Sequence, residues 1–234
     1  INLANNATAN LSGGKLELAG SHGLDGITTD NATTLQINSF GSISRSDNVT
    51  STVGNLVLSQ SGGSSDNGSV SVSFGVDNMS LTVGGAAQFN DADFTLNSAN
   101  LNFQNSPTLD NSSTLSVKNS SELILPSGGT FSDTSLNFTA STFKPSGTVS
   151  LTGSSDFTFD SGSSVMLGGD STLSQSGSVT WPSPDLNSNA LTLNVDNMTL
   201  NGALNIGSEE AINSGASNLS LSSTLTIGNG GTLS

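Results

Sequence analysis

Two pairs of acidic residues have the spacing that acid–base catalysis on a sugar chain would need. Asp91 and Asp93 stand at i and i+2, so they share one face of a strand, and Asp156 and Asp160 flank the segment Phe157-Thr158-Phe159. Paired carboxylates about 5–9 Å apart can serve as acid and base in glycoside hydrolysis. No basic residue lies near either pair, and a chain with a net charge of −14 repels an anionic sugar. We interpret these acids as solvated turn residues and keep a carbohydrate-active enzyme as an alternative.

The segment Asp160-Ser161-Gly162-Ser163 is similar to part of the Gly-Asp-Ser-Gly signature of trypsin-like proteases, but Phe159 precedes it where that signature has glycine. A catalytic triad needs a base within hydrogen-bond reach of the serine. His22, the single histidine, is distant in sequence and stands in a glycine-rich stretch that predicts a loop. We therefore predict a turn at Asp160–Ser163 and no catalytic residue in this chain.

The residues that commonly hold metals are scarce. The chain has no cysteine, and one histidine cannot build a typical zinc site alone. The Gly-Gly-x-Gly-x-Asp calcium repeat and the EF-hand loop do not occur, and Asp66-Asn67-Gly68 and Gly168-Gly169-Asp170 have the composition of ordinary turns. We predict no cofactor and no dedicated metal site, and weak surface calcium stays open.

Composition excludes several classes of partner. Of the 234 residues only 4 are Lys or Arg against 18 Asp or Glu, and the four bases (Lys15, Arg45, Lys118, Lys144) are scattered. Nucleic acid and anionic membrane surfaces both require clustered positive charge. No apolar run exceeds three residues, as in Leu123-Ile124-Leu125, so the sequence predicts no membrane insertion.

The elements that must position any site are short strands. The recurring unit is apolar–polar–apolar, as in Leu16-Glu17-Leu18 and Leu225-Thr226-Ile227, separated by Ser, Gly, Asn, Asp and Thr. Sustained helical spacing of apolar residues is missing, so we expect almost no helix.

These units recur in three columns with a period of about 21 residues. The first column reads Phe94/Leu96, Leu115/Val117, Leu136/Phe138, Phe157/Phe159, Val179/Trp181, Met198/Leu200, Leu219/Leu221. The second reads Leu101/Phe103, Leu123/Leu125, Phe143, Val165/Leu167, Leu186, Leu204/Ile206, Leu225/Ile227. The third reads Leu109, Phe131, Leu151, Leu173, Leu193, Ile212, Leu233. In the first column we expect Leu115, Leu136, Phe157 and Leu219 to stack inside.

Three columns with one period predict an all-β parallel β-helix (β-solenoid) with three short strands per coil. Residues 1–79 should form less regular coils, with a Gly/Ser-rich insertion at 59–78 and a stretch at 20–33 that departs from the template. Residues 80–234 should form regular coils of the same continuous solenoid. An antiparallel sandwich is the competing fold, favoured by Asn67-Gly68, Asn201-Gly202 and Asn229-Gly230, which suit hairpin turns.

The chain resembles autotransporter passenger domains in its columns, its lack of cysteine and its low charge. It also shares short glycine-rich segments with them, namely Gly13-Gly14-Lys15-Leu16, Gly128-Gly129-Thr130-Phe131 and Gly230-Gly231-Thr232-Leu233. The chain is similar in style to filamentous-haemagglutinin-like adhesins as well. This resemblance implies a right-handed parallel β-helix on the bacterial surface or secreted from it, and a host-cell surface or glycan as partner. A non-catalytic stalk or adhesin is thus the expected function, and a subunit that associates end to end in a filament is a further alternative.

Three smaller expectations concern the surface and the ends. Asparagines at repeated turns could stack as ladders. Val57, Ile124 and Met166 are apolar at outward positions, and Ile124 and Met166 could form a patch with Lys144 between them. Ile1-Asn2-Leu3 and Gly231-Thr232-Leu233-Ser234 carry apolar alternation without a cap, so we expect further polypeptide or identical subunits to cover the end coils.

Overall fold

The computed structural model describes residues 9–11, 14–19, 22–23, 27–29, 33–38, 41–45, 51–53, 55–59, 68–74, 79–84, 87–90, 92–110, 112–215 and 218–234. Side chains are described from Thr82 onward, with gaps before residue 112. All regular elements in these ranges are β-strands, without helix, and every ladder between them is parallel. The chain is therefore a β-solenoid of about 21 residues per turn, as predicted, and the antiparallel sandwich is wrong for the described residues.

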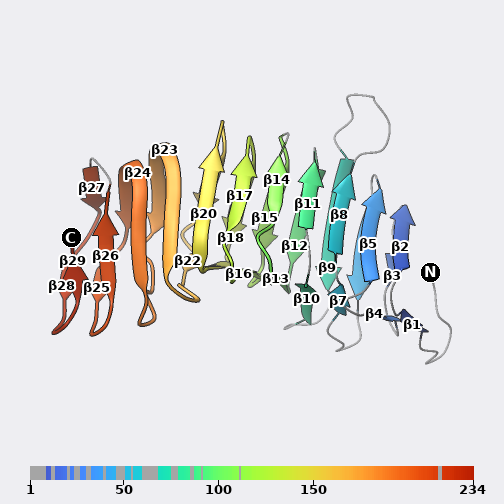
Figure 1. The fold of residues 1–234 in the computed structure, drawn as a ribbon, viewed down its shortest axis with the longest axis horizontal. Helices are drawn as coiled ribbons and strands as arrows, with labels where there is room; N and C mark the ends of the chain where they lie inside the picture. Colours follow the sequence, from blue (N-terminus) through green and yellow to red (C-terminus); the bar gives the residue numbers. More distant parts are fainter. Residues whose placement is uncertain are drawn as a thin grey trace.

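Three sheets form the faces of the coil (Figure 1). Face one contains β2 (Gly14–Ala19), β5 (Thr33–Asn38), β8 (Asn55–Ser59), β11 (Ala87–Asn90), β14 (Thr108–Asp110), β17 (Gly129–Ser132), β20 (Gly147–Thr152), β23 (Ser171–Pro182), β24 (Ala190–Asn201), β26 (Ala211–Ser214) and β29 (Thr232–Leu233). Face two contains β3 (His22–Gly23), β6 (Gly41–Arg45), β9 (Gly68–Phe74), β12 (Ala92–Asn97), β15 (Thr114–Lys118), β18 (Ser135–Thr139) and β21 (Asp156–Phe159).

Face three contains β7 (Ser51–Val53), β10 (Met79–Val83), β13 (Ala99–Phe103), β16 (Glu122–Leu125), β19 (Thr142–Pro145) and β22 (Ser164–Val165). Two separate strand pairs complete the set: β1 (Ala9–Leu11) with β4 (Ile27–Thr29), and β25 (Leu204–Ile206) with β28 (Leu225–Ile227). β27 (Asn218–Leu221) pairs with the second half of β24.

The coil is right-handed. In Figure 1 the strands of face one run upward in front, the chain returns downward behind them, and each turn advances to the left, from the blue to the red end. This is the common hand for connections between parallel strands.

The first column of the sequence is confirmed along most of its length. Leu115 pairs with Leu136, and Leu136 pairs with Phe157 in the next coil. Beyond a break after β21 the column continues, because Met198 pairs with both Val179 and Leu219. Leu136 is fully buried, as expected for an inward residue.

The third column needs a correction at two steps. Val149, not Leu151, pairs with Leu173, and Leu151 pairs with Gln175 instead. In the same way Ile212 pairs with Leu191 rather than Leu193. The period alone did not reveal these shifts, because each strand carries two inward positions and the sequence does not show which of them faces the inward residue of the next coil.

Several strands of the amino-terminal part join parallel ladders. The insertion at 59–78 contains β9, which pairs with both β6 and β12. The stretch at 20–33 contains β3 and β4, which also join parallel ladders. The ladder of face one runs through residues 1–79 and 80–234 alike, so the two predicted ranges share one sheet.

Buried hydroxyl groups line two corners of the regular coils. Ser113, Thr134 and Ser155 stack at the corner between faces one and two. Ser121, Ser141 and Ser163 stack at the corner between faces two and three. The Ser155 hydroxyl donates to Phe131 O at 3.0 Å or Thr152 O at 2.8 Å and accepts from Thr134 N at 3.0 Å, so it joins one coil to the next.

Asparagine ladders form at two places. Asn119 Nδ2 donates to Asn97 Oδ1 at 2.5 Å, and Asn218 Nδ2 donates to Asn197 Oδ1 at 2.7 Å. Each bond crosses one coil, which confirms the expected stacking at these positions.

Candidate functional site

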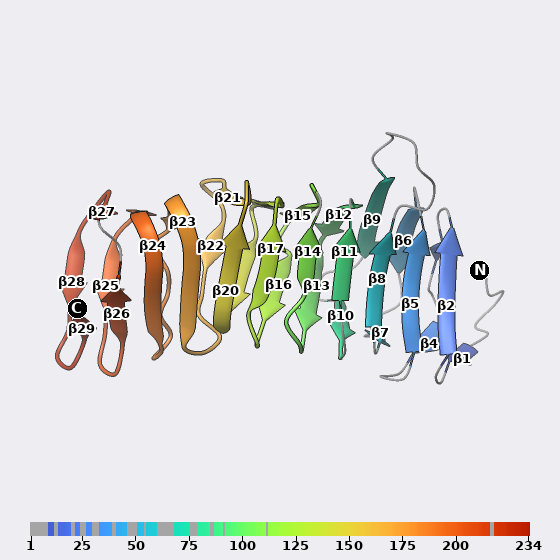
Figure 2. The same ribbon diagram turned by 45° about the horizontal axis from the view of Figure 1, so that its top comes forward.

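A cleft opens on face two where the ladder is interrupted. β21 pairs with β18 on one side, but among the described ladders none joins it to β23 on the other. The two strands lie side by side near the middle of the yellow-to-orange part of the chain (Figure 2). The cleft between them has a volume of about 510 Å³. Its lining consists of Phe157, Thr158, Phe159, Asp160, Ser161, Ser163, Thr180, Trp181, Pro182 and Asn201.

The interruption follows from a change in the length of the corner. Leu151 and Phe157, inward residues on either side of the corner in one coil, are six positions apart, and Thr152–Ser155 between them forms a turn. In the next coil Gln175 and Val179 are four positions apart. Four positions leave no room for that turn, so β23 continues around the corner as one bent strand, with a bulge between Gln175 and Ser178. The two corners differ in shape, and β21 and β23 diverge beyond them.

Aromatic side chains form the floor of the cleft. The Trp181 ring meets Phe157 edge-on at 5.6 Å between ring centroids and Phe159 at 6.3 Å. Phe159 stacks on Phe138 of the preceding coil at 4.7 Å. Trp181 is almost fully buried, whereas Phe157 and Phe159 are half-buried, because no strand covers them on the side of β23.

Asp160 lies at the rim, and its carboxylate holds a turn together. Oδ1 accepts hydrogen bonds from the Ser163 hydroxyl at 2.6 Å, the Ala140 N–H at 3.0 Å and the Gly162 N–H at 3.1 Å. These bonds favour the charged form, with that from the Ser163 hydroxyl the strongest contributor, and lower the pKa of Asp160. A general acid needs a raised pKa, so this environment is unsuited to that role.

The predicted turn at Asp160–Ser163 is confirmed. Ser161 and Gly162 occupy the turn, Ser161 is exposed, and the Ser163 hydroxyl is engaged by Asp160. His22 belongs to β3, at the opposite end of the seven-stranded sheet that β21 terminates, so His22 and Ser161 do not form a triad.

The structure describes the two predicted acidic pairs to different extents. Asp156 begins β21 with an exposed side chain and does not line the cleft that Asp160 borders. The backbone of Asp93 lies in β12 between Ser69 and Thr114, but its side chain is outside the described residues, as is Asp91 altogether. The cleft therefore contains one carboxylate of the four that the sequence singled out.

The candidate metal segments contain turn residues. Asp170 Oδ1 accepts from the Ala190 N–H at 2.8 Å, so the carboxylate of Gly168-Gly169-Asp170 caps the neighbouring coil. Asp66 and Asn67 lie outside the described residues. Within the described part of the chain, no group of three or more His, Cys, Asp or Glu side chains could hold a metal ion.

Carboxylates at other corners also accept a hydrogen bond from the backbone of a neighbouring coil. Their positions in the sequence did not indicate this role. Asp133 Oδ1 accepts from the Ser154 N–H at 2.9 Å, and Asp196 Oδ2 accepts from the Gly177 N–H at 2.8 Å. Glu210 Oε1 accepts from the Ser188 N–H at 3.0 Å. Each bond joins one coil to the next, so part of the acidic composition serves the corners.

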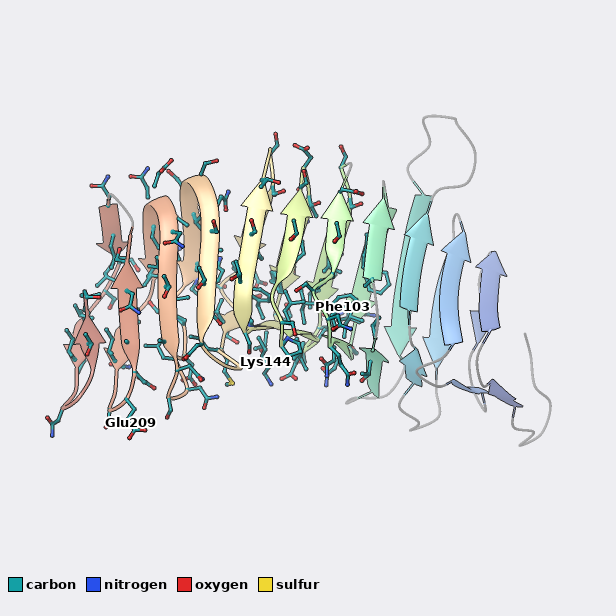
Figure 3. The ribbon with its side chains drawn as sticks, in the orientation of Figure 1. Phe103, Lys144 and Glu209 are labelled. Atoms are coloured by element: carbon teal, nitrogen blue, oxygen red, sulfur yellow. The ribbon has the colours of Figure 1, made fainter. Side chains whose placement is uncertain are left out.

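The predicted patch of Ile124, Lys144 and Met166 is only partly exposed. Lys144 pairs with Ile124 in the ladder, and all three side chains are half-buried. Lys144 Nζ makes a salt bridge of 2.6 Å with Glu122 Oε1, on the lower side of the solenoid in Figure 3. Val57 is outside the residues whose side chains are described.

The cleft itself was not predicted, although the sequence held three signals for it. The first column steps by 22 and then 19 residues around Val179, Gln175 occupies an inward position, and Pro182 ends the strand. Each departs from the regular pattern at the same coil. Together they indicate an irregularity, but not its shape.

No family model, curated protein or solved structure matches this chain. No helix in the described ranges is long and apolar enough to cross a membrane. The class that the fold defines is thus the parallel β-solenoid.

Proposed function

We propose that this chain is a non-catalytic, rigid β-helical part of an extracellular surface protein, a stalk or an adhesin similar to autotransporter passengers. The observation that carries the proposal is the twelve-stranded sheet that includes face one, in which parallel ladders connect β2 to β29 along the rod. Hydrogen bonds along the long axis and a continuous apolar core resist bending, which is the property a stalk requires.

The side chains at the cleft support a non-catalytic role. Asp160, its one carboxylate, accepts three hydrogen bonds at Oδ1 and has a lowered pKa. A carboxylate so engaged maintains a corner of the coil.

The experiment combines imaging, chemistry and location. Electron microscopy of the purified chain should show straight rods of uniform width, and incubation with pectins, neutral glycans and peptides should release no product. Protease added to intact cells of the source organism should degrade the protein. Product release that Asp156→Asn or Asp160→Asn abolishes would establish a carbohydrate-active enzyme instead. Rods that lengthen with protein concentration would establish a filament subunit, and protection from external protease would refute surface exposure.

A further inference from the structure

The cleft between β21 and β23 presents backbone groups from two open strand edges. Asp156 N donates to Thr134 O and Asp160 N donates to Phe138 O, so alternate residues of β21 face β18. The backbone groups of Phe157 and Phe159 therefore face β23. Ser183 N donates to Asn201 O, which by the same alternation directs the groups of Thr180 and Pro182 toward β21. Proline suits this edge because it has no N–H to leave unpaired.

Unpartnered polar atoms gather at the same coil. Trp181 Nε1, Gln175 Oε1 and Ser183 Oγ are buried without a hydrogen-bond partner, and all three belong to β23 or to the residue after it. Trp181 is 1% exposed, and it is one of the residues that line the cleft. Buried polar atoms without partners are rare, so this coil is a point where the stack departs from full hydrogen bonding.

The charge and composition of the lining select a class of ligand. Asp160 is the one charged side chain in the lining, and the whole chain carries −14, so an anionic ligand is repelled. The rim offers hydroxyl and amide groups from Thr158, Thr180 and Asn201, above half-buried phenylalanine rings. Hydroxyl groups beside apolar ring faces complement a neutral sugar, which has polar edges and apolar C–H faces.

The width of the cleft argues against an inserted peptide strand. A strand between β21 and β23 would need about 4.8 Å on each side. Cα atoms of β21 and β23 lie within 8 Å of one another, which is less than a further strand between them would need. The rings of Phe157 and Trp181 are in contact below, at 5.6 Å between their centroids. A volume of about 510 Å³ open to the surface instead suits a compact ligand.

From these observations we infer that the cleft binds a neutral oligosaccharide segment over the Phe157 and Phe159 rings, with Asn201 at the rim. The inference rests on the adhesin form of the proposed function, for which it names the class of ligand.

The single tryptophan makes the test direct. The chain contains one Trp and no Tyr, so its fluorescence reports on Trp181 alone. Neutral di- and trisaccharides of glucose, galactose, xylose and mannose are titrated into the full chain. Oligogalacturonate and an extended hydrophobic peptide are titrated in parallel. We expect a saturable change in the fluorescence with at least one neutral sugar and none with the other two probes.

Variants then locate the binding site. Asn201→Ala should weaken affinity about five- to tenfold, whereas Asn205→Ala, an exposed asparagine outside the lining, should leave it unchanged. Trp181→Phe keeps an aromatic ring but shortens a buried floor residue, so we expect a lower melting temperature, and calorimetry below that temperature should show a similar loss of affinity.

Three outcomes would overturn the inference: no neutral sugar alters the fluorescence at millimolar concentration, the anionic sugar or the peptide binds better, or Asn201→Ala and Asn205→Ala behave alike. Straight, inactive rods without sugar binding refute this inference alone, whereas sugar cleavage refutes the proposed function.

Discussion

The coils up to β21 and the coils of β23 and β24 enclose the same kind of core but turn the first corner differently. In the earlier coils a turn with a buried hydroxyl group separates faces one and two, as at Ser113, Thr134 and Ser155. In β23 and β24 one twelve-residue strand forms both faces without a turn. The stack tolerates either corner as long as successive coils match, because each strand pairs only with its neighbours.

The mismatch falls where the two kinds of coil meet. Val149 and Leu173 are paired across 24 positions, against 20 for the pairs Gly129–Val149 and Leu173–Leu193 on either side. Face one stays paired across this step, whereas face two loses its ladder between β21 and β23. A local change in corner length thus produces a cleft without ending the solenoid.

The largest expected effect is on the regular stack. Leu136→Asp places a charge at a fully buried position between Leu115 and Phe157, at a cost on the order of 5 kcal/mol or more. We expect this variant not to fold, by circular dichroism and hydrogen exchange. Asn137→Asp on the outward side of the same strand should fold normally. A folded Leu136→Asp protein would contradict the coil assignment.

Ser155→Ala tests the corner with the turn. The substitution removes the acceptor of the buried Thr134 N–H and a donor to the backbone of both coils, so we expect a loss of about 1–3 kcal/mol in the free energy of unfolding. Urea denaturation measures this loss. Ser154→Ala is the matched control, since that side chain is exposed. Equal stability of the two variants would show that the hydroxyl ladder contributes little.

Gln175→Leu tests the corner without the turn. It replaces a buried Oε1 that has no partner and extends the apolar position next to Leu151, at the cost of the bond from Gln175 Nε2 to Ser155 O. We expect a gain of roughly 0.5–1 kcal/mol, seen as a higher melting temperature. A lower melting temperature would mean that the bond to Ser155 O matters more than the unpartnered oxygen.

The smallest expected effect is on the dependence of stability on pH. The pKa of Asp160 is lower in the folded than in the unfolded chain, mainly through the Ser163 hydroxyl and then the Ala140 N–H. Its stabilising contribution is therefore complete above the ordinary pKa of the carboxyl and is lost as the pH falls through the lowered value. Denaturation midpoints at about pH 5 and pH 2 should fall less for Asp160→Asn than for the unaltered chain. Parallel pH profiles would exclude this carboxylate as a contributor.

The sequence by itself determined the class of fold and most of the register. Apolar–polar–apolar units at a period near 21 leave few alternatives, because one strand cannot bury its apolar side chains alone and coils must stack to do so. The inward positions of Leu115, Leu136 and Met198 follow from that pattern, as does the turn at Asp160–Ser163.

Only the tertiary structure decided where the ladders fail to match. Whether Leu151 or Val149 faces Leu173 depends on how the corners before and after it fit together, and both residues satisfy the local pattern. The cleft has the same origin, since its floor consists of ordinary core residues such as Phe157 and Trp181. The half-burial of Phe157 arises from the divergence of two neighbouring strands. The period of the sequence shows which residues each coil contains, whereas a gap between two coils depends on how those two coils fit together.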